Sequence, residues 1–142
     1  MAELLIHNSN PLNRRVRDCV YRSLAGFLCC KWRVALDELV CWAADRGLVN
    51  FNYISVYSEF LKEKGYPRFR TPRKGMTVAE FCDEFAKPGN FYILQCPRHL
   101  TVIKYYTFHG NAVVVDSWDC RNLVVEAYWV RDVSDSRIES KV

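Results

Sequence analysis

The sequence predicts an α+β fold, with N-terminal helices packed on a C-terminal antiparallel β-sheet. Between residues 18 and 86, apolar side chains recur at the 3.6-residue spacing of helices that bury one face. Between residues 91 and 130, short apolar runs rich in β-branched and aromatic residues alternate with turn signals. A series of helices followed by a series of strands is typical of the α+β class.

The first half of the chain predicts a short edge strand and then helices separated by glycines or loops. Glycine ends a helix readily because it adopts the left-handed backbone conformation, and Gly47 and Gly65 stand where two of these helices should stop. The expected elements are a strand over Glu3–His7 and helices over Asp18–Cys30, from Trp32 to about Gly47 and from about Asn52 to Gly65.

A further helix is predicted after the Pro- and Arg-rich connector Gly65–Gly75. Thr77 and Glu80 have the spacing of a capping box, and Met76 and Phe81 have that of a hydrophobic staple. The strands expected after this helix are Phe91–Cys96, His99–Phe108, Ala112–Asp116 and Leu123–Val130, with a turn at His109-Gly110-Asn111.

The length of 142 residues suits a single domain with its own core. We expect one domain over 1–142, with a core at about 13–130 and a polar, frayed tail over 132–142. No apolar run reaches the roughly 18 residues of a membrane span, and Met1–Pro11 lacks the pattern of a signal peptide. These features predict a cytoplasmic protein without a membrane contact. The net charge of +4 permits nucleic-acid binding without requiring it.

Seven cysteines are many for this length, but the number is odd and no pair has C-x-x-C spacing. Reduced thiols are therefore expected, with neither a bound metal nor a cofactor. Cys19 has the setting of a reactive thiol, because it enters a predicted helix after a potential cap, Asp18, and close to Arg14, Arg15 and Arg17. The alternative is an ordinary buried thiol that packs as a small apolar residue.

A catalytic thiol needs a base and a group that orients the base. His99 and Asp116 are the best candidates, because one begins a predicted strand and the other ends the next. A regular hairpin centred on Gly110 would place position 99 opposite about position 121, so a bulge or bend is needed to bring Asp116 to His99. The alternatives are an exposed histidine at a strand edge and an aspartate that caps its own turn.

These residues resemble the papain-like cysteine peptidase superfamily, in particular small bacterial and phage domains similar to the bacteriocin-processing C39 type. The resemblance covers about residues 13–129. It rests on Asp18-Cys19 at a helix entry, on the helix 77–81 leading through Gly89 into a strand, on His99 at a strand start, and on the segment 115–119. The order Cys, His, Asp is the order of the superfamily.

The resemblance implies a thiol hydrolase that cleaves a peptide or isopeptide amide. Cys19 would be the nucleophile, His99 the base and Asp116 the group that orients the histidine. Asn13, six residues before the cysteine, would help the Cys19 backbone N–H to form the oxyanion hole. Trp118 would shield the His–Asp pair from water.

The chain departs from the family pattern at two positions. Asn13 stands in place of a glutamine and is one methylene shorter. Arg98 precedes the histidine where such domains often carry a glycine or a small residue, so it can narrow the cleft or recognise an acidic substrate group.

Two other functions remain open from the sequence. The same fold can act without catalysis, as a phage or mobile-element module that binds a host protein in the host cytoplasm. Acyl transfer to an amine uses the same order of catalytic residues, and no feature selects an amine over water.

The basic connector is a further candidate contact surface for a substrate or partner, with Arg70 and Arg73 as its main residues. Aromatic residues interleaved with cations suit nucleic acid, although a solvated loop is the preferred interpretation. The basic residues begin at the end of the preceding predicted helix and continue through the connector, with Tyr66 and Phe69 between them: Lys62, Lys64, Arg68, Arg70, Arg73 and Lys74.

Overall fold

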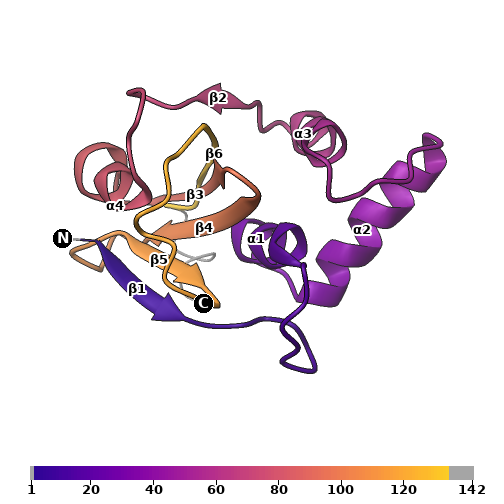
Figure 1. Ribbon diagram of the computed structural model, residues 1–142, viewed down its shortest axis with the longest axis horizontal. Helices are drawn as coiled ribbons and strands as arrows, with labels where there is room; N and C mark the ends of the chain where they lie inside the picture. The colour runs from indigo at the N-terminus through magenta and orange to yellow at the C-terminus, as the bar shows by residue number, and fades with distance from the viewer. Residues whose placement is uncertain (1, 135–142) are drawn as a thin grey trace.

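The computed structural model of the chain describes residues 2–134, and Figure 1 shows the path of the chain. It is an α+β arrangement of helices on a six-stranded sheet. The elements in chain order are β1 (Glu3–Ile6), α1 (Cys19–Leu28), α2 (Trp32–Asp45), α3 (Ile54–Glu63), β2 (Phe69–Arg70), α4 (Val78–Glu80), a π-helical turn (Phe81–Phe85), β3 (Asn90–Cys96), β4 (His99–Tyr105), β5 (Val113–Asp116) and β6 (Ala127–Asp132).

The sheet has the strand order β1-β5-β4-β3-β6-β2 and is mixed rather than antiparallel throughout. The central strands pair antiparallel as predicted, but β1 pairs with β5 in parallel, with Ile6 opposite Asp116. A purely antiparallel sheet was therefore the wrong expectation. Parallel neighbours need a long connection, and between β1 and β5 the chain passes through all four α-helices and the strands β2, β3 and β4.

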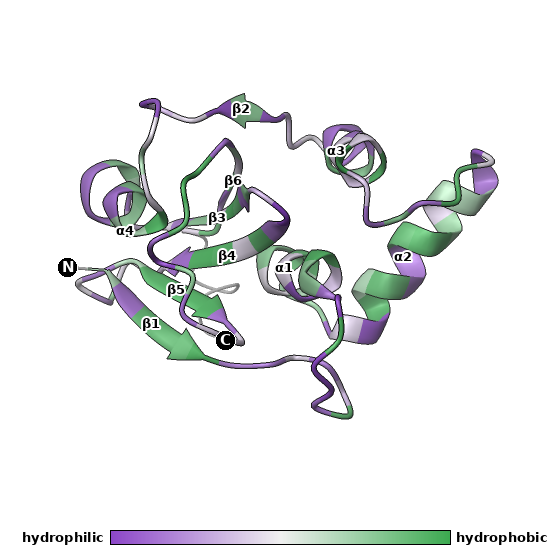
Figure 2. Cartoon of the chain, in the orientation of Figure 1, coloured by the Kyte–Doolittle hydropathy of each residue, from purple (hydrophilic) through white to green (hydrophobic). Residues whose placement is uncertain are grey.

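Both faces of the sheet are buried, which explains why β3 is an unbroken apolar run rather than an alternating one. Phe91 and Ile93 face the core shared with α1, α2 and α3, whereas Tyr92 and Leu94 face a second core beneath α4. Figure 2 shows apolar residues along the central strands and polar residues in many of the loops between them. The helices thus occupy both sides of the sheet.

Several boundaries differ from the sequence expectations. The capping box of Thr77 and Glu80 is present, but the strand expected from Leu123 begins only at Ala127. The connector that was expected to be irregular contains the short strand β2, which pairs with β6. Val133 is buried and donates its N–H to the Gly89 carbonyl, so the tail is ordered beyond Asp132. Positions 135–142 of the expected tail lie outside the described residues.

Helix α1 lies directly on β4, and Gly26 makes this approach possible. A Cβ atom at position 26 would lie 3.0 Å from the Val102 Cγ1 atom. This is closer than carbon atoms pack without displacement. We therefore expect Gly26→Ala to lower the free energy of unfolding by roughly 1–3 kcal/mol through overpacking, as urea denaturation would measure.

Gly110→Ala is the matched control for that substitution. A Cβ at position 110 would meet no heavy atom within 4 Å. This control should keep or slightly raise the stability, because alanine restricts the unfolded chain more than glycine does. An equal loss of stability in both variants would mean that the α1–β4 contact is not responsible.

Candidate active site

The register of the β4–β5 hairpin brings His99 and Asp116 together without a bulge. Val102 pairs with Val115, so continuing the register places Asp116 opposite Thr101. His99 is two residues from Thr101 and therefore on the same face, diagonally next to Asp116. The expectation that a bulge or bend is needed was wrong, because the hairpin loop begins after Tyr105 and is not centred on Gly110.

Asp116 is a buried carboxylate with four hydrogen-bond donors around it. Oδ2 lies 2.6 Å from His99 Nε2 and accepts from the Cys120 thiol at 3.3 Å. Oδ1 accepts from Arg22 Nη1 at 2.9 Å and from the Ser117 N–H at 2.7 Å. Its side chain is 1% exposed. All the lone-pair positions of the carboxylate are therefore used, and its orientation is fixed.

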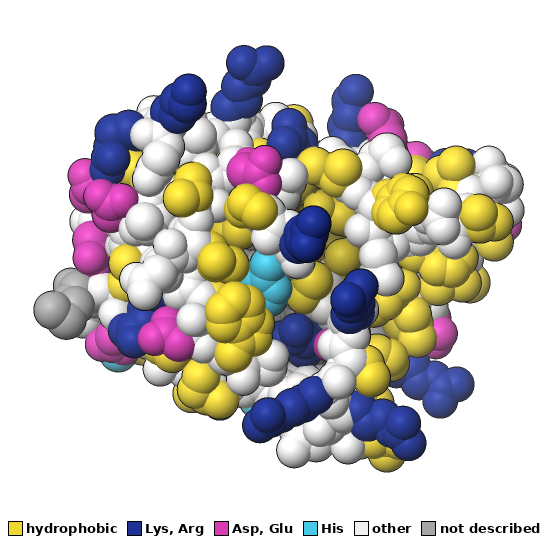
Figure 3. Space-filling model, in the orientation of Figure 1, with side chains coloured by type: hydrophobic (Ala, Val, Ile, Leu, Met, Phe, Trp, Pro, Cys, Tyr) yellow, Lys and Arg dark blue, Asp and Glu magenta, His cyan; other side chains and the backbone are white. Residues whose placement is uncertain are grey.

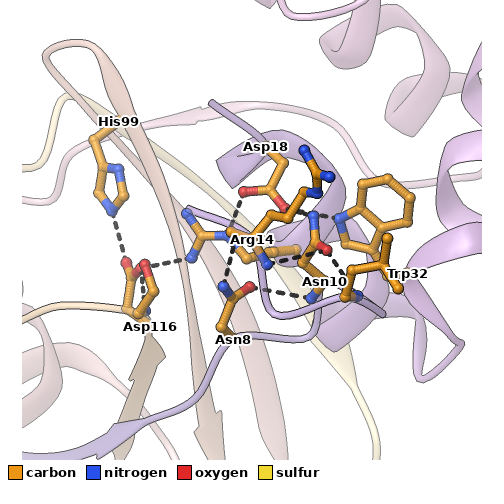
Figure 4. Close-up of polar contacts among 10 residues, drawn as sticks. Asn8, Asn10, Arg14, Asp18, Trp32, His99 and Asp116 are labelled. Atoms are coloured by element: carbon orange, nitrogen blue, oxygen red, sulfur yellow. Dashed lines mark hydrogen bonds and ion pairs between the residues drawn. The ribbon is translucent and has the colours of Figure 1, made fainter. Parts of the chain in front are cut away.

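Arg22 joins this carboxylate to a second one, that of Asp18, at the start of α1. Figure 4 shows Asp116 next to His99 and Asp18 at the start of the helix. Its Nε donates to Asp18 Oδ1 at 2.8 Å, while Nη1 reaches Asp116. Asp18 also accepts from the Trp32 indole N–H at 2.9 Å and from the Asn10 amide at 3.2 Å. Asp18 was expected to cap α1 with its side chain, but the oxygens are used by these three partners instead. Only its backbone carbonyl serves the helix, by accepting from the Arg22 N–H.

Cys19 is the first residue of α1 and interacts with the ring of His99. Burial raises the pKa of the Cys19 thiol, but hydrogen bonds from His99 and from the Leu100 backbone outweigh it and hold the pKa below its ordinary value. The charge of Arg22 acts in the same direction. Because Nε2 of His99 is committed to Asp116, Nδ1 is the ring nitrogen left for the thiol.

The pKa of His99 is shifted in the opposite direction to that of Cys19. Burial lowers the pKa of His99, but the hydrogen bonds to Asp116, Cys120 and Cys19, together with the charge of Asp116, outweigh it and raise the pKa to about 11. The contact between His99 and Asp116, with Arg22, holds the pKa of Asp116 below its ordinary value against the effect of burial. A lowered thiol pKa beside a raised imidazole pKa favours a thiolate–imidazolium pair at neutral pH.

Trp118 lies where the sequence analysis expected it. Its ring centroid is 4.9 Å from that of His99, and 45% of the residue is exposed. It therefore covers the histidine from one side. Next to it, a hollow of about 600 Å³ runs between the N-terminal loop and the segment after β5, lined in part by Arg14, Arg15, Arg17 and Ser117. Figure 3 shows a histidine next to yellow hydrophobic side chains on this face, with Lys and Arg side chains to its right.

Asn13 lies in an exposed turn with a positive φ of 53°, and its N–H donates to the Asn10 carbonyl. Its role in an oxyanion hole stays a prediction. The Cys19 N–H belongs to the first turn of α1, where backbone N–H groups have no intrahelical partner.

Arg98 is the second residue of the two-residue turn between β3 and β4 and has a positive φ of 57°. Glycine would adopt this conformation at lower cost. The side chain is exposed next to His99, which agrees with its expected place beside the site.

Arg70 and Arg73 lie away from these residues, around β2 at the far edge of the sheet. Arg73 is paired with Glu80 and Glu84, and Arg70 is exposed. The aromatic residues of the same connector are used within the fold, because Tyr66 packs on Phe27 and Phe69 stacks on Tyr128. These contacts make the connector a poor stacking surface for nucleic acid.

Sequence reasoning missed Arg22, Asn10, Trp32 and Cys120. The i, i+4 spacing of Asp18 and Arg22 was a readable signal for the ion pair between these two residues. The ion pair between Arg22 and Asp116 joins residues 94 positions apart and has no local signal.

A metal ion is a further possibility for part of this site. His99, Asp116 and Cys120 offer ligand atoms that lie within 4.8 Å of one another. However, the Arg22 guanidinium already neutralises Asp116 at 2.9 Å, and a second cation on the same carboxylate would be repelled. These three side chains are therefore better suited to the hydrogen bonds between them than to binding a metal ion.

No protein-family model, curated protein or solved structure matches the chain. Within residues 2–134, no helix combines the length and the apolar character needed to cross a membrane.

Proposed function

We propose that the protein is a papain-like thiol hydrolase that cleaves a peptide or isopeptide amide through Cys19, His99 and Asp116. The observation that carries this proposal is the geometry of the three residues: His99 Nε2 lies 2.6 Å from Asp116 Oδ2, and Cys19 begins α1 beside the His99 ring. The lowered pKa of Cys19 and the raised pKa of His99 agree with this geometry. Perturbed groups with matched roles are typical of catalytic sites.

In this mechanism the Cys19 thiolate attacks the amide carbon and forms a tetrahedral oxyanion. The Cys19 N–H, with a second donor for which Asn13 is the candidate, stabilises that oxygen. The His99 imidazolium then gives its proton to the departing amine, which leaves a thioester on Cys19. Neutral His99 takes a proton from water, the hydroxide attacks the thioester, and the acid and the thiolate are released.

The substrate approaches along the hollow lined by Arg14, Arg15 and Arg17, with Arg98 beside the histidine. Positive charge around the nucleophile attracts acidic peptide segments and further stabilises the thiolate. Acyl transfer differs only in that an amine replaces water in the second step.

The test is competitive alkylation with limiting iodoacetamide at neutral pH, read by mass spectrometry at each cysteine. We expect Cys19 to react at least about tenfold faster than the other six, because each unit of thiol pKa changes the thiolate fraction roughly tenfold. Cys29 and Cys41 are exposed and serve as internal controls for accessibility. If either is labelled before Cys19, the thiol is not activated and the hydrolase proposal fails.

A second candidate is the same fold used as a binding module on a host protein. The exposed side chain of Asn13 favours it, because an oxyanion hole needs a donor aimed at the site. Cys19→Ala distinguishes the two functions, since it abolishes hydrolysis but leaves binding intact.

A further inference from the structure

A second pocket shares Arg22 with the hollow beside Trp118. It opens between α1 and the strands β4 and β5 and has a volume of about 550 Å³, which is the size of a small-molecule site. Its lining includes His7, Ser9, Arg22, Gly26, Cys29, Lys31, Val102, Lys104, Asp116 and Arg131.

The charge of this pocket is unbalanced. Four cationic side chains line it, namely those of Arg22, Lys31, Lys104 and Arg131, against one carboxylate, that of Asp116. All the lone-pair positions of Asp116 are used by the partners described above, so it does not neutralise the other three cations. Positive charge is therefore concentrated in a concave space.

Lys104 is the most informative of these residues. Its side chain is partly buried, its Cε lies next to the backbone of Gly26, and its Nζ is 5.2 Å from the centroid of the Phe91 ring. Among residues 2–134 it has no carboxylate partner at ion-pair distance, and burial lowers its pKa. An ammonium removed from water without an anion is a cost to the free protein.

Ser9 also lines this pocket. Its Oγ is covered by neighbouring atoms and has no hydrogen-bond partner within the described part of the chain, so a rotation of the side chain would turn it toward an anionic oxygen. Buried hydroxyl groups almost always have a partner.

We propose that this pocket binds a small molecule carrying a phosphate group, held by Lys104, Lys31 and Arg131 with Ser9 as a hydroxyl donor. Within residues 2–134 these three cations have no carboxylate partner at ion-pair distance, and they match a dianion better than a single carboxylate. The position between α1 and the sheet suits a small molecule and excludes a nucleic-acid duplex. The proposal does not depend on the hydrolase function. However, Arg22 and Asp116 belong both to this pocket and to the candidate active site, so a bound molecule would contact the residues that hold His99 in place.

The test is the thermal unfolding of the whole chain against inorganic phosphate, with sodium chloride at equal ionic strength as the reference. A ligand that binds the folded state raises the unfolding temperature saturably. We expect that rise in the wild type, in Lys104→Arg and in Lys62→Met, which removes an exposed lysine on α3. In Lys104→Met the apparent affinity for phosphate should fall at least about tenfold. Without phosphate, this variant should unfold at or above the wild-type temperature, because an unpaired ammonium has been removed.

Several results would overturn the proposal. One is an equal phosphate-dependent rise in Lys104→Met, and another is the absence of a saturable rise in the wild type. A Lys104→Met protein that unfolds below the wild type without phosphate would show that the lysine stabilises the apo fold. A single-stranded oligonucleotide that binds more tightly than phosphate, and that phosphate does not displace, would assign the charge to nucleic acid instead.

Discussion

Replacing Arg22 with methionine is expected to lower the free energy of unfolding by about 3–5 kcal/mol, the usual result of removing one partner of a buried ion pair. The Asp116 and Asp18 side chains are 1% and 4% exposed, and the substitution leaves Asp18 without a cation and Asp116 with His99 alone. Urea denaturation at neutral pH measures the loss. Adding Asp18→Asn to this variant should recover part of the stability, because it removes the carboxylate left without a cation.

Arg46→Met is the matched control for the Arg22 substitution. Arg46 also pairs with a carboxylate, that of Glu63, but the two side chains are 39% and 56% exposed. Its loss should cost less than about 1 kcal/mol. Similar losses in the two variants would show that the Arg22 bridge contributes no more than a surface pair.

Arg22→Met should also change the pH at which the protein unfolds in acid. Because the pKa of Asp116 is lowered in the folded state, its contribution to stability is present above the ordinary value of about 3.9 and is lost as pH falls through the lowered value. Without Arg22 the folded-state pKa rises. Acid unfolding of Arg22→Met should therefore begin at higher pH than in the wild type.

Replacing Asp116 with asparagine should slow alkylation of Cys19 at pH 7 at least about tenfold. Burial lowers the pKa of His99, and the Asp116 contact is the largest of the effects that raise it to about 11. Without the carboxylate, His99 is mostly neutral at pH 7 and the pKa of the Cys19 thiol rises. The measurement is the rate of iodoacetamide labelling at Cys19 from pH 5 to pH 9. The wild-type rate should fall only below the lowered pKa of the thiol, and that of the variant should fall at higher pH.

Asp119→Asn is the control for this pH profile. Asp119 lies three residues away and pairs with Arg121 on the surface. It should leave the profile unchanged. If Asp116→Asn also leaves it unchanged, His99 does not depend on Asp116 for its charge, and the triad is not a unit.

Local signals in the sequence were sufficient for the elements that depend on neighbouring residues. Thr77 and Glu80 predicted a capping box because that motif spans four residues, and it is present. Cys19 was placed at a helix entry for the same reason, and α1 begins there. The α+β class followed from such elements taken in order.

What the sequence could not supply was the register between distant segments. Shifting the hairpin loop away from Gly110 changed which residue lies opposite His99, and no local residue determines that shift. The parallel pairing of β1 with β5 and the bridge from Arg22 to Asp116 join the two ends of the described chain. Such contacts depend on how the helices return the chain to the sheet.

The long separation between Cys19 and its partners has a consequence for protein synthesis. His99 and Asp116 leave the ribosome 80 and 97 positions after Cys19. Until β4 has been made, the hydrogen bonds from His99 and from the Leu100 backbone that lower the pKa of the Cys19 thiol are absent. The thiol therefore has a higher pKa during translation, and its pKa falls only when the sheet has formed.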